Sequence, residues 1–251
     1  MEKDKKMPCI SVVIPVFNSE NTLEELYNRL TKSLIVHSSD YEIIFINDSS
    51  GDDSSDIIYR LAENDSNVVC FDLAKNYGQH NALLCGIRQA KYDLIVTLDD
   101  DLQNPPEEIP KLLEKLDQGY DVVYGYPKIE KHGIFRNWAS VITKMALKTT
   151  MGVENAGNVS AFRVFRTDLR DAFSDYKGSF ISIDVLLSWG TNSFSALPVN
   201  HEQRAEGKSN YTVRKLINHA LNMITGFSVL PLQIASIIGF VLSIFGVFIL
   251  I

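Results

Sequence analysis

Residues 94–106 read LIVTLDDDLQNPP, an apolar run that changes abruptly into three consecutive aspartates. The run is short and rich in β-branched residues, which favours a buried strand that ends at the carboxylates. Side chains two residues apart point to the same side of an extended chain, so Asp99 and Asp101 share a side. Their oxygens are the ligands that Mg²⁺ or Mn²⁺ prefers. We therefore predict a divalent-metal site, with a solvated acidic loop or an acidic helix start at Glu107 and Glu108 as the alternative.

The chain on either side repeats this pattern of a strand followed by polar residues. Short β-rich runs alternate with amphipathic segments from residue 9 to residue 125, which predicts an α/β fold with a Rossmann-like, mostly parallel sheet flanked by helices. We expect strands at 10–14, 41–46, 68–73, 94–98, 122–124 and 161–165, and helices at 22–33, 54–64, 78–90 and 107–118. In open sheets of this kind ligands bind at the carboxyl ends of the strands. Asn18, Asp48 and Lys75 follow the first three strands, so we expect them at one site with the aspartates.

Two further polar segments favour a bound nucleotide. Residues 47–54 read NDSSGDDS, in which Asp53 or Ser54 is expected to cap the next helix. Asp48 can accept a hydrogen bond from a nucleobase N–H, although a turn of this composition can also serve the helix alone. In the segment IPVFNSE, residues 14–20, Phe17 can pack against a base, and an ordinary strand-to-helix loop is the alternative.

Composition limits the partners and the compartment. The formal net charge of −7 argues against nucleic acid, which is held by dense stripes of Lys and Arg. Cys9, Cys70 and Cys85 form no C-x-x-C pair, which indicates reduced thiols in a domain facing the cytoplasm. The polar, Lys-rich N-terminus does not resemble a cleavable signal peptide.

The C-terminal region predicts a membrane anchor. After Lys215 the chain has no Asp, Glu, Lys or Arg, and residues 227–251 exceed the roughly 20 apolar residues that a membrane helix needs. We predict a transmembrane helix at 227–251, with a buried core helix as the alternative, and an interfacial amphipathic helix at 211–226. The catalytic domain is expected to span 1–210 and to face the cytoplasm, because basic residues precede the apolar run. Since the run has no closing polar flank, we expect that further membrane helices are missing.

Several ordered motifs resemble one enzyme family. VVIPVFNSEN at 12–21, NDSSGDDS at 47–54, AKNYGQHNALLCG at 74–86 and TLDDDLQNPPEEIP at 97–110 resemble the family 2 glycosyltransferases of the GT-A fold. HEQRAEGKSNYTVRKL at 201–216 is similar to the polyprenyl-phosphate branch of that family. The resemblance covers essentially the whole chain. It implies transfer of a sugar from a nucleotide-sugar to undecaprenyl or dolichyl phosphate, with inversion and with Mg²⁺ or Mn²⁺, at a bacterial-type inner membrane.

The resemblance also assigns roles to individual residues. It places at the nucleotide Pro15, Phe17, Glu20, Asp48, Lys75 and Asp99. The metal ligands are expected in the pattern D-x-D-x-Q, namely Asp99, Asp101 and Gln103, with Asp100 at the variable middle place. The acceptor phosphate is expected to meet Lys128, Lys131, Arg136 and Ser140. Catalysis by charge neutralisation is assigned to Asp101, Arg136, Arg204 and Lys208.

Alternative functions are weighed against the same residues. A phosphate monoester is already an anion at neutral pH, with a second pKa of about 6, so no histidine base is required and His80, His132 and His201 are expected to be structural. The chain lacks G-x-G-x-x-G after its first strand, which excludes an NAD-dependent oxidoreductase. A phosphatase with a D-x-D nucleophile, a processive polysaccharide synthase and a degenerate membrane scaffold remain alternatives. Membrane lipids are expected partners, and a homo-oligomer is left open.

Overall fold

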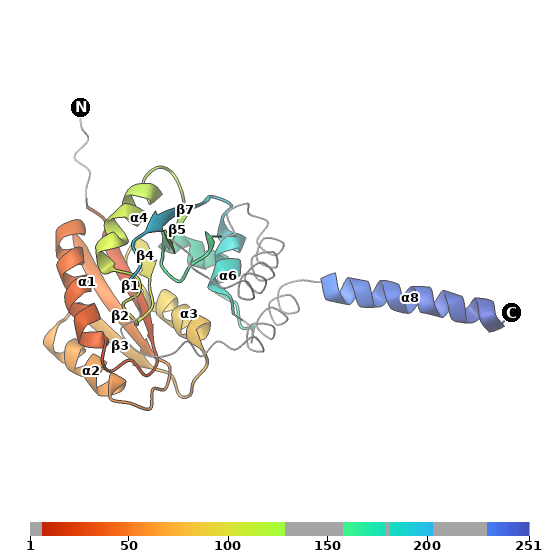
Figure 1. The fold of residues 1–251 in the computed structure, drawn as a ribbon, viewed down its shortest axis with the longest axis horizontal. Coiled ribbons are helices and arrows are strands. Elements are labelled where there is room, and N and C mark those ends of the chain that lie inside the picture. The colour runs from red at the N-terminus through yellow and green to blue at the C-terminus, as the bar shows by residue number, and fades with distance from the viewer. Residues whose placement is uncertain (1–6, 129–157, 179–180, 203–229, 251) are drawn as a thin grey trace.

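The computed structural model describes residues 7–128, 158–178, 181–202 and 230–250 (Figure 1). A single seven-stranded sheet runs through the middle of the α/β domain, in the order β3-β2-β1-β4-β6-β5-β7. Its strands are β1 Cys9–Val16, β2 Asp40–Asn47, β3 Val68–Asp72, β4 Leu94–Thr97, β5 Val122–Pro127, β6 Arg163–Arg166 and β7 Phe194–Val199. β6 is antiparallel to β4 and β5, and the other neighbours are parallel. The predicted mostly parallel sheet is confirmed.

Helices cover both faces of the sheet (Figure 1). The helical elements are α1 Leu23–His37, α2 Ser54–Asn64, α3 Gln79–Gln89, η1 Pro106–Glu108, α4 Ile109–Leu116, η3 Thr167–Phe173 and α6 Ile183–Gly190. The apolar sides of α1, α2 and α4 pack against one face of the sheet, and those of α3, η3 and α6 against the other. Burial on both faces explains why the central strands read as continuous apolar runs rather than alternating ones.

The order of the strands predicts a ligand-binding crevice next to β1. β1 lies between β2 and β4, so the chain leaves β1 toward one side and later returns to the other. Such a reversal opens a crevice at the carboxyl ends of the strands. β4 pairs with β1 only as far as Val13, and Pro15 therefore stands beyond the β1–β4 ladder, where its missing N–H costs less. The carboxyl ends of β1 to β4 consequently form one edge of the sheet.

The first helix begins differently from the prediction. Thr22, the first residue of the predicted helix, stands immediately before α1, and its hydroxyl makes no capping bond. It donates instead to the carbonyl oxygens of Ser19, at 3.1 Å, and Asp100, at 2.6 Å. Likewise, Asp53 precedes α2 without a side-chain cap, and Asp52 accepts the Ser54 N–H at 3.1 Å. The Thr22 hydroxyl therefore contacts loops, whereas Asp52, and not the predicted Asp53 or Ser54, supplies the acceptor at the start of α2.

The last described element is α8, Leu230–Leu250, which Figure 1 draws apart from the sheet. Its apolar side chains lie on the surface: Ile237 is 64% exposed, Phe240 70% and Phe245 64%. Within the described ranges, no helix combines the length and the apolar character that crossing a membrane requires. The predicted interfacial helix at 211–226 lies outside those ranges.

Candidate active site

Four loops meet at the carboxyl edge of the sheet, following β1 (17–22), β2 (48–53), β3 (73–78) and β4 (98–105). We call them the first, second, third and fourth loops. Each holds one residue in the left-handed region of the backbone, with φ of 54° at Asn18, 61° at Ser49, 89° at Gly78 and 61° at Leu102. A residue with a Cβ adopts this conformation only when its surroundings stabilise it. The contacts between the loops show what does so.

Asp100 joins the fourth loop to the first. Its Oδ2 accepts hydrogen bonds from the Phe17 N–H at 3.1 Å and from the Ser19 hydroxyl at 2.5 Å. Desolvation raises the pKa of the Asp100 carboxyl, although these two donors oppose the shift. The middle aspartate therefore points away from the side expected for Asp99 and Asp101 and has a structural partner. The alternation of side chains along an extended chain was the signal for this.

Asn18 joins the first loop to the second. Its Oδ1 accepts the Gly51 N–H at 2.8 Å, and its own N–H donates to the Ser50 hydroxyl at 3.1 Å. Glu20 adds a second connection, because its carboxylate accepts the Asp53 N–H at 3.0 Å. Glu20 was predicted to line the nucleotide pocket, and this contact fixes it at the rim of the first two loops.

Asp48 joins the second loop to the third. The residue is 3% exposed, and its two carboxylate oxygens accept the N–H groups of Tyr77 and Gly78 at 2.7 and 2.8 Å. A carboxylate offers about four lone-pair sites, so these bonds leave acceptor capacity for a ligand. Lys75, in the same third loop, lies with its ammonium 5.0 Å from the centre of the Tyr77 ring.

Gln79, the residue directly after the third loop, connects that part of the chain to the fourth loop. It is the first residue of α3, and its side-chain Nε2 donates to Asp99 Oδ1. The four loops are thus linked in a closed ring by hydrogen bonds, which we call the loop ring. Within the loop ring, Phe17 is 48% exposed, whereas Pro15 is buried inside β1. Of these two predicted nucleotide residues, only Phe17 therefore presents a side chain to solvent.

The predicted metal ligands lie together on the fourth loop. Asp99 and Asp101 are partly exposed, and Asp101 accepts the Gln103 N–H at 3.1 Å. In the described part of the chain, no three His, Cys, Asp or Glu side chains converge as a complete metal cage. Mg²⁺ and Mn²⁺ sites in nucleotide-using enzymes commonly take one or two carboxylates and fill the remaining positions with phosphate oxygens and water. Two neighbouring carboxylates on a tied loop fit that kind of site.

The chain that follows β7 returns to the fourth loop. The Glu202 N–H donates to the Gln103 carbonyl at 3.0 Å. Asn200 donates from Nδ2 to Glu108 at 2.7 Å and accepts from the Lys128 ammonium at 3.2 Å. Lys128, predicted to contact the acceptor phosphate, is therefore held at the end of β5, beside the chain that leaves β7. The other predicted basic and acceptor residues lie outside the described residues: Lys131, Arg136, Ser140, Arg204 and Lys208.

The hydrogen bonds that define the loop ring involve no histidine. His80 lies in the first turn of α3, where its Nδ1 accepts the Ile183 N–H at 3.4 Å, and His201 is exposed after β7. Residues that the sequence interpretation missed are Gln79, Asp100 in its joining role, and Arg29, which binds both Glu107 and Glu202. The contacts of Gln79 and Arg29 join segments far apart in sequence, so no local pattern indicates them.

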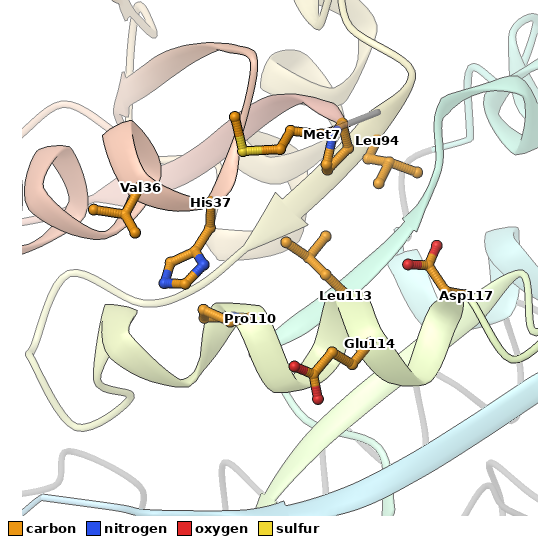
Figure 2. Close-up of a pocket in the computed structure, with 9 residues that line it drawn as sticks. Met7, Val36, His37, Leu94, Pro110, Leu113, Glu114 and Asp117 are labelled. Atoms are coloured by element: carbon orange, nitrogen blue, oxygen red, sulfur yellow. The ribbon is translucent and has the colours of Figure 1, made fainter. Parts of the chain in front are cut away.

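A cavity of about 310 Å³ lies elsewhere, at the amino ends of β1 and β4 (Figure 2). Figure 2 shows Met7 and Leu94 on one side, Val36 and His37 of α1 on another, and Leu113 of α4 between them. The carboxylates of Glu114 and Asp117 stand at its border. None of the residues that line it belongs to the loop ring or to the predicted site. This cavity and the polar loops therefore occupy opposite edges of the sheet.

Known proteins resemble this chain in sequence and in fold. The family model described as Glycosyl transferase family 2 matches residues 11–176. An undecaprenyl-phosphate 4-deoxy-4-formamido-L-arabinose transferase of Pseudomonas fluorescens (strain SBW25) is 36% identical over 239 residues, which cover 95% of this chain and 70% of the relative. That match extends past the sheet into the C-terminal region.

Two solved structures share the fold at low sequence identity. A fragment of S. aureus TarS in complex with UDP has a TM-score of 0.55 at 19% identity, covering 76% of this chain, and this chain spans 59% of that one. The glucosyl-3-phosphoglycerate synthase of Mycobacterium tuberculosis, in complex with Mn²⁺ and UDP-glucose, has a TM-score of 0.60 at 18% identity and covers 86% of this chain and 77% of its own. Both likenesses support the sheet and its flanking helices.

Proposed function

Because this chain belongs to glycosyl transferase family 2, we propose that it transfers a sugar from a nucleotide-sugar to undecaprenyl phosphate. The observation that carries the proposal is the match, over 95% of the chain, to a relative named for transfer to that lipid phosphate. Inversion at the anomeric carbon belongs to the proposal, since the acceptor phosphate would displace the nucleotide in one step.

The loop ring supports donor binding at the carboxyl ends of β1 to β4. In the proposal, the base packs near Phe17, whose side chain is 48% exposed, and donates to Asp48. Because Asp48 already holds the Tyr77 and Gly78 N–H groups, its position is set before the donor arrives. Such preorganisation reduces the ordering that binding must cost. Pro15, Glu20 and Lys75 would shape the pocket from β1 and from the first and third loops.

A divalent cation, Mg²⁺ or Mn²⁺, belongs to the proposal. Asp99 and Asp101 would hold it, with Gln103 nearby, and it would neutralise charge on the departing nucleoside diphosphate. Asp100 supports this geometry, because its bonds to Phe17 and Ser19 hold the fourth loop against the first. Gln79 orients Asp99 from the other side.

In the proposed mechanism, the acceptor phosphate must be held in position, but it need not lose a proton to a base. A lipid phosphate is already anionic near neutral pH, so its oxygen can attack the anomeric carbon without a base. Lys128 would contribute positive charge there, together with Lys131, Arg136, Ser140, Arg204 and Lys208 from the segments outside the described residues. Holding the two anions together in the correct orientation would then supply much of the rate.

A membrane location completes the proposal, with residues 1–210 as a catalytic domain on the cytoplasmic side. The exposed apolar side chains of α8, among them Ile237, Phe240 and Phe245, support burial of this helix in lipid. A lipid acceptor held in the same bilayer would reach the site at high local concentration. The segments 211–226 and 227–251 are proposed as the interfacial and the membrane-inserted parts.

The test is transfer of label into lipid. The full chain in detergent with Mn²⁺ is given radiolabelled UDP-, GDP- or dTDP-sugars together with undecaprenyl phosphate, and undecaprenol, which lacks the phosphate, serves as the matched control acceptor. We expect one donor to label the organic phase only when the phosphate is present. Free labelled sugar would indicate a hydrolase, and a water-soluble polymer would indicate a processive synthase. Nucleotide binding without transfer from any donor would favour the scaffold alternative.

A further inference from the structure

Arg29 is the centre of a charge network beside the fourth loop. It lies on α1, its side chain is 19% exposed, and it binds two carboxylates at once. Nε and Nη2 donate to Glu107 at 3.0 and 2.8 Å, and Nη1 and Nη2 donate to Glu202 at 3.1 and 2.8 Å. Paired bonds of this kind fix direction as well as distance, because the guanidinium is a rigid fork.

The network would be repulsive without its arginine. The hydrogen bonds from Arg29 hold the pKa of Glu107 and that of Glu202 below the usual range for glutamate. Glu25, one helical turn earlier on α1, is a third carboxylate, 3.7 Å from Arg29. Removing the guanidinium would leave three carboxylates close together and push Glu202 away from Glu107.

The carboxylates that Arg29 joins belong to segments that matter for the site. Glu107 follows the fourth loop within η1, and Glu202 ends the described chain after β7. The Glu202 N–H also donates to the Gln103 carbonyl at 3.0 Å, so the chain after β7 is tied to the fourth loop by backbone and by side chain. Exposed ion pairs usually contribute little to stability, so the main effect of this network is to fix the geometry of the two segments.

We propose that Arg29 is a positioning residue for the transfer reaction: it fixes the chain leaving β7 against the fourth loop, so that the two act on the same donor. The inference rests on the proposed function. Arg204, to which the resemblance assigns charge neutralisation, stands two residues after Glu202 in the sequence, and two residues of chain span at most about 7 Å. Anchoring Glu202 also keeps Asn200, which binds Glu108 and the Lys128 ammonium, beside the fourth loop.

The first experiment uses a charge swap. Arg29→Ala should lower kcat at least tenfold while the donor KM changes less than threefold, because leaving-group stabilisation acts in the transition state. Arg29→Glu should be worse, and the double variant Arg29→Glu with Glu202→Arg should recover at least a third of wild-type kcat, since an arginine again faces Glu107. Arg60→Ala is the matched control: Arg60 of α2 pairs with Glu24 of the same α1, with both side chains more than half exposed.

A second measurement does not depend on activity. Hydrogen exchange should show protection of the Glu202 amide in the wild type, and Arg29→Ala should accelerate its exchange at least tenfold while β1 amides and the melting temperature stay nearly unchanged. Unaltered exchange at Glu202 in Arg29→Ala would overturn the inference, and this measurement needs no turnover. Absence of turnover with every donor would defeat the proposed function instead. Wild-type kcat in a folded Arg29→Ala, or a double variant no better than Arg29→Glu, would overturn it as well.

Discussion

The two edges of the sheet differ in what they hold. The amino edge contains the cavity of about 310 Å³ between α1 and α4, lined largely by apolar side chains such as Met7, Leu94 and Leu113. The carboxyl edge has the loop ring, in which Asp48, Asp100 and Gln79 bind neighbouring loops. A hollow needs only imperfect packing, whereas a polar ring needs each buried donor and acceptor to be matched. In this fold, the cavity and the polar groups suited to binding and catalysis therefore lie in different places.

The strongest test of the difference removes a carboxylate from the carboxyl edge. Asp101→Ala should lower transfer by more than about 100-fold, because a group that stabilises charge in the transition state is lost. The fold should persist, since Asp101 is partly exposed and lies on a loop. Transfer assays with Mn²⁺ and circular dichroism check both parts. Full turnover by this variant in metal-free buffer would show that the carboxyl edge works without the cation.

The next change breaks one joint of the loop ring. Asp100→Ala leaves the Phe17 N–H without its acceptor and the Ser19 hydroxyl with only the Phe17 carbonyl, at 3.2 Å, which should cost about 1 to 3 kcal/mol in the free energy of unfolding. We also expect about tenfold weaker donor binding, since the first loop loses its contact with the fourth. Urea unfolding and calorimetry with nucleoside diphosphate measure the two effects. Asp100→Asn, which keeps one acceptor oxygen, should be milder; equal losses would contradict the assigned geometry.

A third change separates binding from chemistry at Asp48. Asp48→Asn replaces one acceptor oxygen with a donor that faces a backbone N–H of Tyr77 or Gly78. We expect donor affinity to fall about tenfold, with kcat at saturating donor changing less, because contacts to a base are the same in the ground and transition states. Steady-state kinetics across donor concentrations decides it. Unchanged affinity with a lowered kcat would move Asp48 from binding to catalysis.

At the amino edge, a substitution that disturbs packing should lower stability without changing the rate of sugar transfer. Leu113 is 7% exposed and lines the cavity, so Leu113→Ala should reduce the free energy of unfolding by about 2 to 3 kcal/mol. Transfer per folded molecule should stay within twofold of the wild type at 20 °C. The pair of measurements is unfolding in urea and label transfer normalised to folded protein. A tenfold loss of transfer would mean that the two edges are coupled.

The smallest expected effect is the acid dependence of the Arg29 network. Glu107 and Glu202 have lowered pKa values, so their contribution to stability is present above the unfolded pKa of about 4.3 and is lost as pH falls through the folded values. The difference in unfolding free energy between wild type and Arg29→Ala should be constant from pH 7 to about pH 5 and shrink below about pH 4. Unfolding curves across this range provide the check. Both side chains are about half exposed, so the difference itself should be small.

The sequence predicted the first four strands, because their apolar patterns match their burial in the sheet. β1, β2, β3 and β4 are continuous apolar runs that end in polar residues, and all four lie within one or two residues of their predicted positions. β7 was missed because FSALPV mixes Ser195 and Pro198 into a short strand, and α6 because its eight residues are too short to show a helical period.

For the candidate site, the sequence indicated which loops gather but not how they are joined. The clusters after β1, β2 and β4 were visible as polar residues at strand ends, and the fold brings them together. The bond that Asp100 accepts from Ser19 and the bond that Gln79 donates to Asp99 depend on tertiary distances that no sequence spacing encodes. Assignments carried by the resemblance to Arg136, Arg204 and Lys208 stay predictions, because these residues lie outside the described ranges.

The closed ring of loops limits how this enzyme's donor preference can be re-engineered. The first, second and fourth loops each take part in two joints, so a graft of one of them from a relative must replace two sets of matched contacts at once. Residues 48–53, for example, carry both the partners of Asn18 and the acceptor of the Tyr77 and Gly78 N–H groups. Donor preference should therefore be transferable between relatives by exchanging adjacent loops together, or by point changes at exposed positions such as Phe17, which belongs to a joint only through its backbone.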